Sequence, residues 1–349
     1  MAELVFVLTD FFSAAGAEGR GQDAGAGLQR LPVLETLLAR SRVTALAADW
    51  RGWLAARSSN VSCRVATPAE TVAAAYGAGP SGQVPGQVWL ATPVHYFAGL
   101  DSVHLHPAGL LRLHSEEQQR LTADFARVFA DSPWELRSFG QRELLLAGPA
   151  INASGADPAY FAGCDPSPGL PHGEGAATLR RLGAEMEMWL YEHPLNLERG
   201  RRGELPVTTL WLWGAEARAA ATPPVGVPAA AAVPIAPAAA ARLYGSDTYA
   251  EALWRLQGGV AAALPAAFDA ALITPHADSV FLYPLLRPQG LRAAFEQLEQ
   301  RWLPAALRAV SARRVSVLRL VVGARAYGWG WLDRARFWRP RAPWWETLA

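Results

Sequence analysis

The segment Tyr191–Gly214 reads YEHPLNLERGRRGELPVTTLWLWG and connects a predicted helix to a predicted strand. The helix is expected over about 177–192, and Pro194 ends it because the residue before a proline is disfavoured in the helical conformation. Residues 207–213 are apolar on both alternating faces apart from two threonines, which predicts a buried central strand. The loop between them is polar and basic, and it contains Asn196, Arg199, Arg201 and Arg202.

Predicted strands and helices alternate through much of the remaining chain. Leu4–Leu8 is an unbroken apolar run, which is typical of a strand in a parallel sheet. A helix is predicted to begin after Ser115 as its cap, and another to cover 291–310 with a kink at Pro304. Hairpins are predicted near Gly140 and in the C-terminal region. These patterns favour an α/β fold, with a largely parallel central sheet flanked by helices and antiparallel hairpin additions.

The predicted domain organisation depends on a stretch rich in alanine and proline near the middle of the chain. Residues 1–214 are expected to form the first part of an α/β core, and 242–349 its second part with a Trp/Arg-rich hairpin and tail. Residues 215–241 are rich in alanine and proline, which indicates a linker or a surface insertion.

Composition excludes several classes of protein. The chain has 349 residues and a formal net charge of +1, which argues against a dedicated nucleic-acid-binding protein. All 32 basic residues are arginine. Without lysine the chain cannot use Schiff-base chemistry, a Walker lysine or a catalytic Ser-Lys pair. Its two cysteines are too few for a disulfide framework or a Cys-rich zinc site.

The N-terminal residues do not match the pattern of a secretory signal peptide. The first apolar run lacks a preceding basic segment and is too short for a signal peptide or a membrane span. We therefore expect a cytoplasmic protein without a membrane span.

Four residues are candidate metal ligands. Asp10 follows the first predicted strand, and ligands gather beyond the carboxyl ends of parallel strands. His95, His104 and His106 lie within a short stretch, but their spacing matches no specific zinc pattern. The alternative roles, a cap for Asp10 and structural positions for the histidines, are favoured.

The region from Arg301 onward combines ten arginines with six of the fourteen tryptophans. Such a mixture can bind a phosphate-rich partner through charge and stacking. Alternating tryptophans at 329 and 331 are also typical of one face of a structural strand. The tail FWRPRAPWWETLA is a candidate docking segment for a protein partner, because adjacent aromatic residues require burial.

The central segment resembles archaeal-type cofactor-independent phosphoglycerate mutases, in which a His-Pro-x-Asn sequence, an arginine, a glycine and a Trp-Leu-Trp-Gly strand follow in this order. The matching positions are His193, Pro194, Asn196, Arg199, Gly203, Trp211, Leu212, Trp213 and Gly214. A closer similarity is to bacterial regulatory proteins of the RpfE type, through Pro93-Val94-His95, the stretch Leu182–Pro194 and the ending RFWRP.

This resemblance implies an alkaline-phosphatase-like fold but not the catalytic residues of that superfamily. Its phosphomutases use two metal ions, held by aspartates and histidines, and a serine or threonine nucleophile. Asp10 matches the first ligand position, but the later ligand sets are missing, since His276 is the one histidine after Pro194. The nucleophile loop is not recognisable either.

The sequence therefore favours a non-catalytic regulatory or scaffold protein on a degenerate phosphoglycerate-mutase-like fold, which needs no cofactor. A metal-dependent phosphomutase or phosphohydrolase, with Mn or Zn, is the first alternative, and a sensor of a phosphorylated metabolite is the second. His193, Asn196 and Arg199 are the candidate substrate-binding residues. Bracing of the helix end by Asn196 and Arg199 is the competing interpretation, and we favour it.

Overall fold

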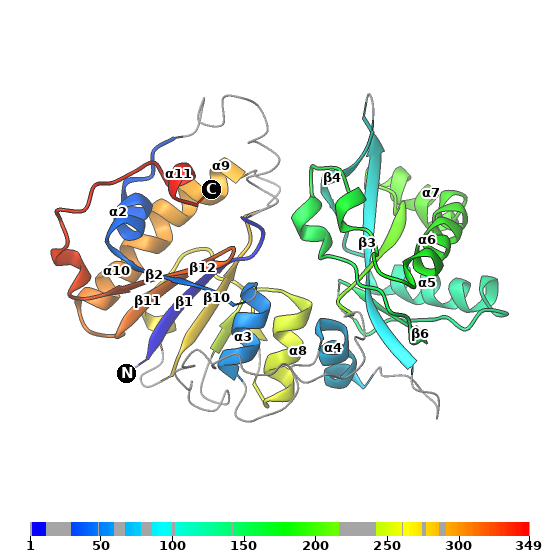
Figure 1. Ribbon diagram of the computed structural model, residues 1–349, viewed down its shortest axis with the longest axis horizontal. Coiled ribbons are helices and arrows are strands. Elements are labelled where there is room, and N and C mark those ends of the chain that lie inside the picture. The colour runs from blue at the N-terminus through cyan, green and yellow to red at the C-terminus, as the bar shows by residue number, and fades with distance from the viewer. Residues whose placement is uncertain are drawn as a thin grey trace. The chain divides into compact units, whose positions relative to one another are not determined.

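The computed structural model describes residues 2–11, 29–47, 49–58, 67–77, 86–99, 102–140, 142–215, 242–259, 261–273, 277–285 and 291–348. The chain forms two compact units (Figure 1). The first contains Met1–Val65 and Ala231–Ala349, and the second contains Ala66–Ala230. The predicted boundary after residue 214 falls within the second unit, and residues 216–241 of the predicted linker lie outside the described residues.

The first unit contains a seven-stranded, mostly parallel sheet in the order β2-β12-β11-β1-β10-β8-β9. Its strands are β1 (Glu3–Leu8), β2 (Arg42–Ala45), β8 (Arg242–Tyr244), β9 (Ala261–Ala262), β10 (Ser279–Tyr283), β11 (Val317–Val322) and β12 (Arg325–Gly330). β1 runs parallel to both β10 and β11, whereas β11, β12 and β2 pair antiparallel. The predicted α/β class, the mostly parallel sheet and the C-terminal hairpin are confirmed for this unit.

Helices cover both faces of this sheet (Figure 1). They are α2 (Pro32–Arg40), α3 (Trp50–Ser58), α8 (Thr248–Leu256), α9 (Leu291–Gln297), α10 (Leu303–Ser311) and α11 (Trp344–Leu348). Alternate residues of β1 enter different cores: Phe6 packs with residues of α2 and α10, whereas Val7 packs with Trp50 of α3 and Trp254 of α8. Burial on both faces explains why the β1 sequence is apolar without alternation.

The helix predicted over 291–310 is interrupted differently from the prediction. A π-helical turn, η5 (Leu298–Trp302), separates α9 from α10, and Pro304 lies in the first turn of α10. A proline in that place lacks an N–H that a continuous α-helix would use, and the wider turn before it accommodates this. The predicted kink at Pro304 is therefore corrected to a π turn that precedes it.

The second unit has a five-stranded sheet whose described ladders are all antiparallel. Its strands are β3 (Gly86–Ala98), β4 (Val103–Leu110), β5 (Glu135–Arg137), β6 (Leu144–Pro149) and β7 (Thr209–Trp213). The long strand β3 pairs with β4, β6 and β7. The hairpin predicted near Gly140 is confirmed as β5 and β6. β7 is buried at every position, as predicted, but it joins an antiparallel sheet rather than the centre of a parallel one.

Four α-helices accompany this sheet in the described part of the second unit: α4 (Pro68–Tyr76), α5 (Ser115–Val128), α6 (Ala176–Tyr191) and α7 (Pro194–Arg201). Leu121 and Phe125 of α5 and Met186 of α6 enter the core under the sheet. The boundaries of α6 match the prediction within a residue or two. Two other predictions are corrected: the helix after 114 is preceded by His114 as its N-cap, so Ser115 is its first residue, and the predicted basic loop contains the short helix α7.

None of the helices in the described residues is both long and apolar enough to cross a membrane.

Candidate functional site

The candidate site is built on α7 and on the turn that follows it. Pro194 lies in the first turn of α7, where a missing N–H is tolerated, and His193 precedes it as the N-cap. Nδ1 of His193 accepts a hydrogen bond from the backbone N–H of Leu195 at 3.2 Å. After the C-cap Arg202, Gly203 has a φ of 72°, in the left-handed region that favours glycine.

Asn196 connects the end of α6 to the segment that enters β7. Its Nδ2 donates to the carbonyl of Leu190 at 2.7 Å and to that of Val207 at 2.9 Å. Its Oδ1 accepts from the N–H of Val207 at 2.7 Å. Both amide hydrogens and the carbonyl oxygen are thus used by backbone groups, which makes this side chain a brace.

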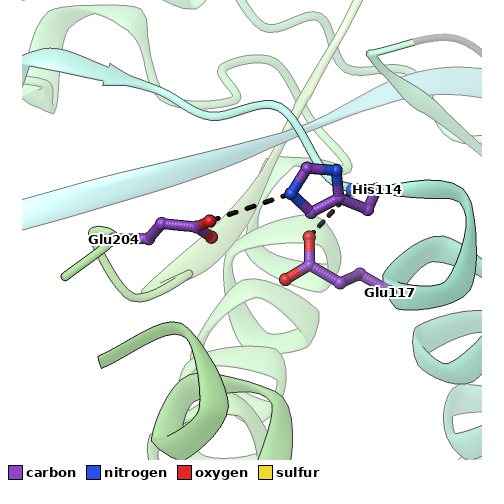
Figure 2. A group of neighbouring side chains, drawn as sticks. All are labelled: His114, Glu117 and Glu204. Atoms are coloured by element: carbon purple, nitrogen blue, oxygen red, sulfur yellow. Dashed lines mark hydrogen bonds and ion pairs between the residues drawn. The ribbon is translucent and has the colours of Figure 1, made fainter. Parts of the chain in front are cut away.

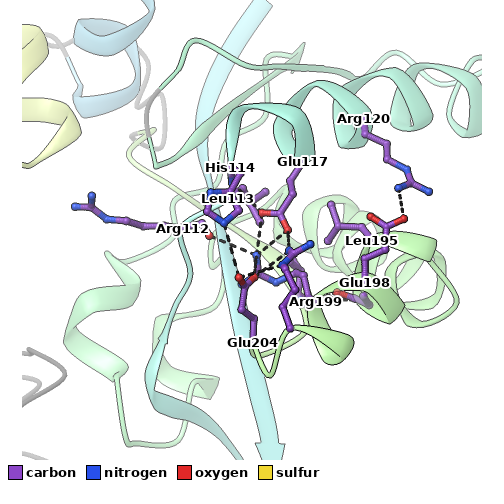
Figure 3. A network of polar contacts seen from close by, with 12 residues as sticks. Arg112, Leu113, His114, Glu117, Arg120, Leu195, Glu198, Arg199 and Glu204 are labelled. Carbon is purple, nitrogen blue, oxygen red and sulfur yellow. Dashed lines mark hydrogen bonds and ion pairs between the residues drawn. The ribbon is translucent and has the colours of Figure 1, made fainter.

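Arg199 is buried at the centre of a polar network (Figure 3), with an exposed fraction of 3%. Its Nε donates to the carbonyl of Leu205 at 2.8 Å, and its Nη1 lies 3.4 Å from the carbonyl of Arg112. Nη1 also donates to the Glu117 carboxylate, at 3.0 Å from Oε2. Together these contacts join the turn after α7 to the first turn of α5.

Two glutamates and two arginines balance each other in this network. Glu117 accepts from the N–H of His114 at 2.8 Å and is bound by both Arg199 and Arg202. Glu204 accepts from Nη2 of Arg202 at 3.0 Å and lies 3.3 Å from Nη1 of Arg199. The hydrogen bond from Arg202 holds the pKa of Glu204 below its usual value. The four charges sum to zero, so the network offers no surplus charge to an anion or a cation.

The same network contains a possible set of metal ligands (Figure 2). Ligand atoms of His114, Glu117 and Glu204 lie within 4.8 Å of one another, and Nε2 of His114 is 3.7 Å from Oε1 of Glu204. These are chemically suitable ligands for Zn or Mn. However, Arg199 and Arg202 already hold both carboxylates, and a divalent cation would have to approach two guanidinium charges. The surroundings therefore do not fit a metal ion.

His193, the third predicted substrate-binding residue, is also buried. Its Nε2 lies 3.1 Å from Oδ2 of Asp124, without the alignment of a good hydrogen bond. Because Nδ1 accepts from a backbone N–H, the neutral ring carries its proton on Nε2, toward Asp124. Burial lowers the pKa of His193, and the nearby Asp124 carboxylate offsets this only in part. The ring serves as a neutral helix cap.

The three histidines predicted as metal ligands lie on the hairpin of β3 and β4. Nδ1 of His95 is 3.0 Å from the carbonyl of Pro206, and the rings of His95 and His106 are 5.7 Å apart between centroids. His104 contacts the Ser102 hydroxyl at 2.9 Å. Among the described residues, the ligand atoms of His114, Glu117 and Glu204 lie within 4.8 Å of one another. His95, His104 and His106 do not form such a group of three. Burial lowers the pKa of His95, which favours its neutral form.

Asp10 lies in the first unit, two residues beyond the end of β1. The preceding Thr9 donates its N–H to the carbonyl of Tyr283 at 3.3 Å, which places this turn beside the carboxyl end of β10. The predicted position of Asp10 at the carboxyl edge of a parallel sheet is therefore confirmed. The other predicted ligands, His95, His104 and His106, belong to the second unit.

Local sequence pattern does not identify two members of the network, Glu117 and Glu204. Glu117 lies in the first turn of α5, and its partners Arg199 and Arg202 are more than eighty residues away in sequence. Glu204 is separated from the basic run by Gly203, and the closeness of arginines and glutamates in this stretch is the signal in the sequence of an internal ion-pair network.

The second unit also has a shallow groove of about 550 Å³. Its lining is Tyr76, Gly77, Gln119, Thr122, Glu135, Leu136, Arg137, Ser138 and Phe139. No residue predicted as a metal ligand or substrate contact lines this groove.

Comparison with known proteins gives distant structural likenesses. No family model and no curated protein matches the sequence. The cofactor-independent phosphoglycerate mutase from Thermoplasma acidophilum is 14% identical, with a TM-score of 0.37 over 95% of this chain and 90% of that chain. The PH0037 protein from Pyrococcus horikoshii is 10% identical, with a TM-score of 0.42 over 94% of this chain and 87% of that chain. TM-scores this low carry no argument about shared function.

Proposed function

We propose that this chain is a non-catalytic protein of the regulatory or scaffold class, in which residues 193–204 brace the second unit. One observation carries the proposal: Arg199, a candidate substrate-binding residue, is 3% exposed and bound to protein oxygens. A phosphate would have to displace a carboxylate and two carbonyls from it. That exchange gains little, because the existing contacts are already charge-assisted.

The family relationship belongs to the same proposal. A degenerate phosphoglycerate-mutase-like ancestry, membership of the RpfE-type bacterial proteins and an alkaline-phosphatase-like fold rest on the sequence resemblance alone. A cytoplasmic location rests on the short apolar run near the N-terminus. A function that needs no cofactor is consistent with the fixed ion pairs of Glu117 and Glu204.

One observation favours the enzymatic alternative. Asp10 lies beside the carboxyl end of β10, at the edge of a parallel sheet where ligands are commonly bound. A metal-dependent phosphomutase or phosphohydrolase, with Mn or Zn, would use this carboxylate as a ligand.

Metal content and turnover together test the proposal. The purified chain is equilibrated with Mn or Zn, freed of loosely bound ions, analysed for retained metal and assayed with phosphoglycerate and with a simple phosphomonoester. We expect no retained metal and no turnover above buffer. Asp10→Ala is the test variant, and Asp131→Ala, which removes an exposed carboxylate, is the matched control. Metal-dependent turnover that Asp10→Ala abolishes and Asp131→Ala preserves would establish the enzyme instead.

Binding of phosphoglycerate without turnover is the remaining outcome. Calorimetric titration with phosphoglycerate detects it. Saturable binding that Arg199→Gln removes would favour a metabolite sensor over a scaffold.

A further inference from the structure

The segment after β12 exposes an unusual number of aromatic side chains. From 331 to 342, every residue is exposed except Asp333 and Arg336. Phe337 is 76% exposed and Trp338 is 68% exposed. Elsewhere in the first unit, large rings such as Trp302 are almost completely buried. We call residues 331–342 the aromatic ridge; it is part of the red trace between β12 and α11 (Figure 1).

The aromatic ridge is held in place by its backbone and by arginines. The Asp333 carboxylate accepts from the N–H of Gly330 at 2.8 Å and pairs with Arg336 at 3.1 Å. Arg336 also donates to the carbonyl of Arg40 at 3.1 Å, and Arg339 to that of Ser41 at 3.2 Å. The exposed rings are therefore presented by an anchored segment, not by a loose tail.

The distal part of the tail is different, because it packs against its own unit. Trp344 is buried, with its ring 4.4 Å from that of Phe295, and its backbone N–H donates to Glu35. The docking role predicted for the whole tail is thereby narrowed to the residues that precede Pro343.

The charge of the aromatic ridge is positive. Arg334, Arg339 and Arg341 are exposed within it, and Arg313 and Arg314 are exposed at the end of α10. Within the ridge the one acidic residue, Asp333, is buried and paired. Arg313 adopts a φ of 56°, which is unfavourable for a residue other than glycine, and its guanidinium lies 4.5 Å from the centroid of Trp331.

We propose that the aromatic ridge docks on an anionic lipid bilayer. The rings of Phe337 and Trp338 would insert at the level of the headgroups, where aromatic side chains are favoured, and Arg334 and Arg341 would contact lipid phosphates. Because exposed side chains extend along the whole segment, the ridge can contact a broad surface such as that of a bilayer. Complementary charge and apolar insertion then act together, as stable peripheral binding requires.

Two other partner classes fit these observations less well. Nucleic acid bases stack on open ring faces, but Arg313 and Arg334 lie over Trp331, at 4.5 and 5.6 Å from its ring centroid. An extended peptide commonly adds to a free strand edge, yet β12 is already paired with β11 and β2.

Vesicle flotation of the full chain tests the proposal. Vesicles of phosphatidylcholine alone are compared with vesicles that also contain phosphatidylglycerol. We expect binding to the anionic vesicles that weakens with added salt. The double variant Phe337→Ala with Trp338→Ala should reduce the partition coefficient about tenfold or more. Arg334→Gln and Arg341→Gln should each reduce it roughly fivefold.

The control variant removes exposed apolar side chains from the second unit. Met188 and Tyr191 are 68% and 86% exposed, and their double change to alanine should leave binding unaltered. Unchanged circular dichroism and melting confirm that each variant is folded. Glycerol phosphate as a competitor separates recognition of a bilayer from recognition of a free phosphate.

Three results would each overturn the proposal: no flotation with anionic vesicles, equal losses in the test and control pairs, or displacement from vesicles by glycerol phosphate. Tighter binding to a single-stranded oligonucleotide or to polyglutamate, at the same ionic strength, would assign the ridge to that partner class instead. The assay involves no turnover, so its failure would leave the proposed function untouched.

Discussion

At the scale of single residues, Asn196 and Arg199 of α7 act through contacts inside the protein. Asn196 uses its whole amide on the backbone of Leu190 and Val207. Arg199 binds Glu117, which is 82 residues away in sequence. Both residues therefore link distant parts of the second unit.

Replacement of Arg199 is the direct test of this bracing role. Arg199→Ala should lower the free energy of unfolding by about 3 kcal/mol, because it leaves Glu117 with fewer partners in a buried position. Arg201→Ala is the matched control, since Arg201 lies in the same helix and is exposed. It should cost less than about 0.5 kcal/mol. Urea unfolding measures both, and equal costs would contradict the bracing role.

His193 should make the second unit sensitive to acid. Burial lowers the pKa of His193 below its ordinary value of 6.5, so the folded state binds fewer protons than the unfolded state. The stability that the neutral ring contributes is present above that ordinary value. It is lost as the pH falls below it toward the lowered folded-state pKa.

The variant His193→Asn isolates this effect, because asparagine also caps helices but does not titrate. Its melting temperature should fall less than that of the unaltered chain between about pH 7.5 and pH 5.5. His95, whose pKa is also lowered by burial, remains in both proteins and cancels in the comparison. If the melting temperatures of the two proteins depended on pH in the same way, His193 would not contribute to acid sensitivity.

At the scale of elements, α2 depends on a carboxylate from another helix. Its N-cap, Leu31, offers no side-chain acceptor. Glu299 in the π turn fills this role, because its two oxygens accept from the N–H groups of Val33 and Leu34 at 2.7 and 2.9 Å. The π turn and the start of α2 are thereby coupled.

Loss of Glu299 should therefore destabilise the first unit. Glu299→Ala is expected to cost about 2 kcal/mol, because two helix N–H groups lose their acceptors. Glu296→Ala, which removes a partly exposed ion pair with Arg292, should cost less than about 0.5 kcal/mol. Chemical denaturation distinguishes them. A cost for Glu299→Ala as small as that of the control would show that water replaces the cap.

At the scale of the whole molecule, each compact unit has its own hydrophobic core. Leu320 belongs to the core of the first unit and Leu146 to that of the second, and both are fully buried. Separate cores predict that the units open separately.

Core truncation in each unit checks this independence. Leu320→Ala and Leu146→Ala should each cost about 2–5 kcal/mol locally. Hydrogen exchange measured by mass spectrometry should then show faster exchange mainly in peptides of the unit that carries the change. The two variants serve as controls for each other, and faster exchange in both units from either change would indicate one cooperative molecule.

Local sequence pattern was sufficient to predict several of the helices and strands. The period of apolar residues predicted α6, and continuous hydrophobicity predicted the buried strands β1 and β7, because burial of a face leaves a repeat in the sequence. The position of Pro194 predicted the end of α6 but not the start of α7. A proline also favours the first turn of a new helix, and Pro194 occupies that place in α7.

The sequence by itself determined the α/β class, the boundaries of several elements and the exclusion of lysine-dependent chemistry. The tertiary structure alone decided that the chain forms two units, that β7 pairs antiparallel with β3, and that Arg199 faces Glu117. The physical reason is the range of the interactions. Periodicity and capping act over a few residues, whereas strand partners and buried ion pairs depend on segments that only folding brings together.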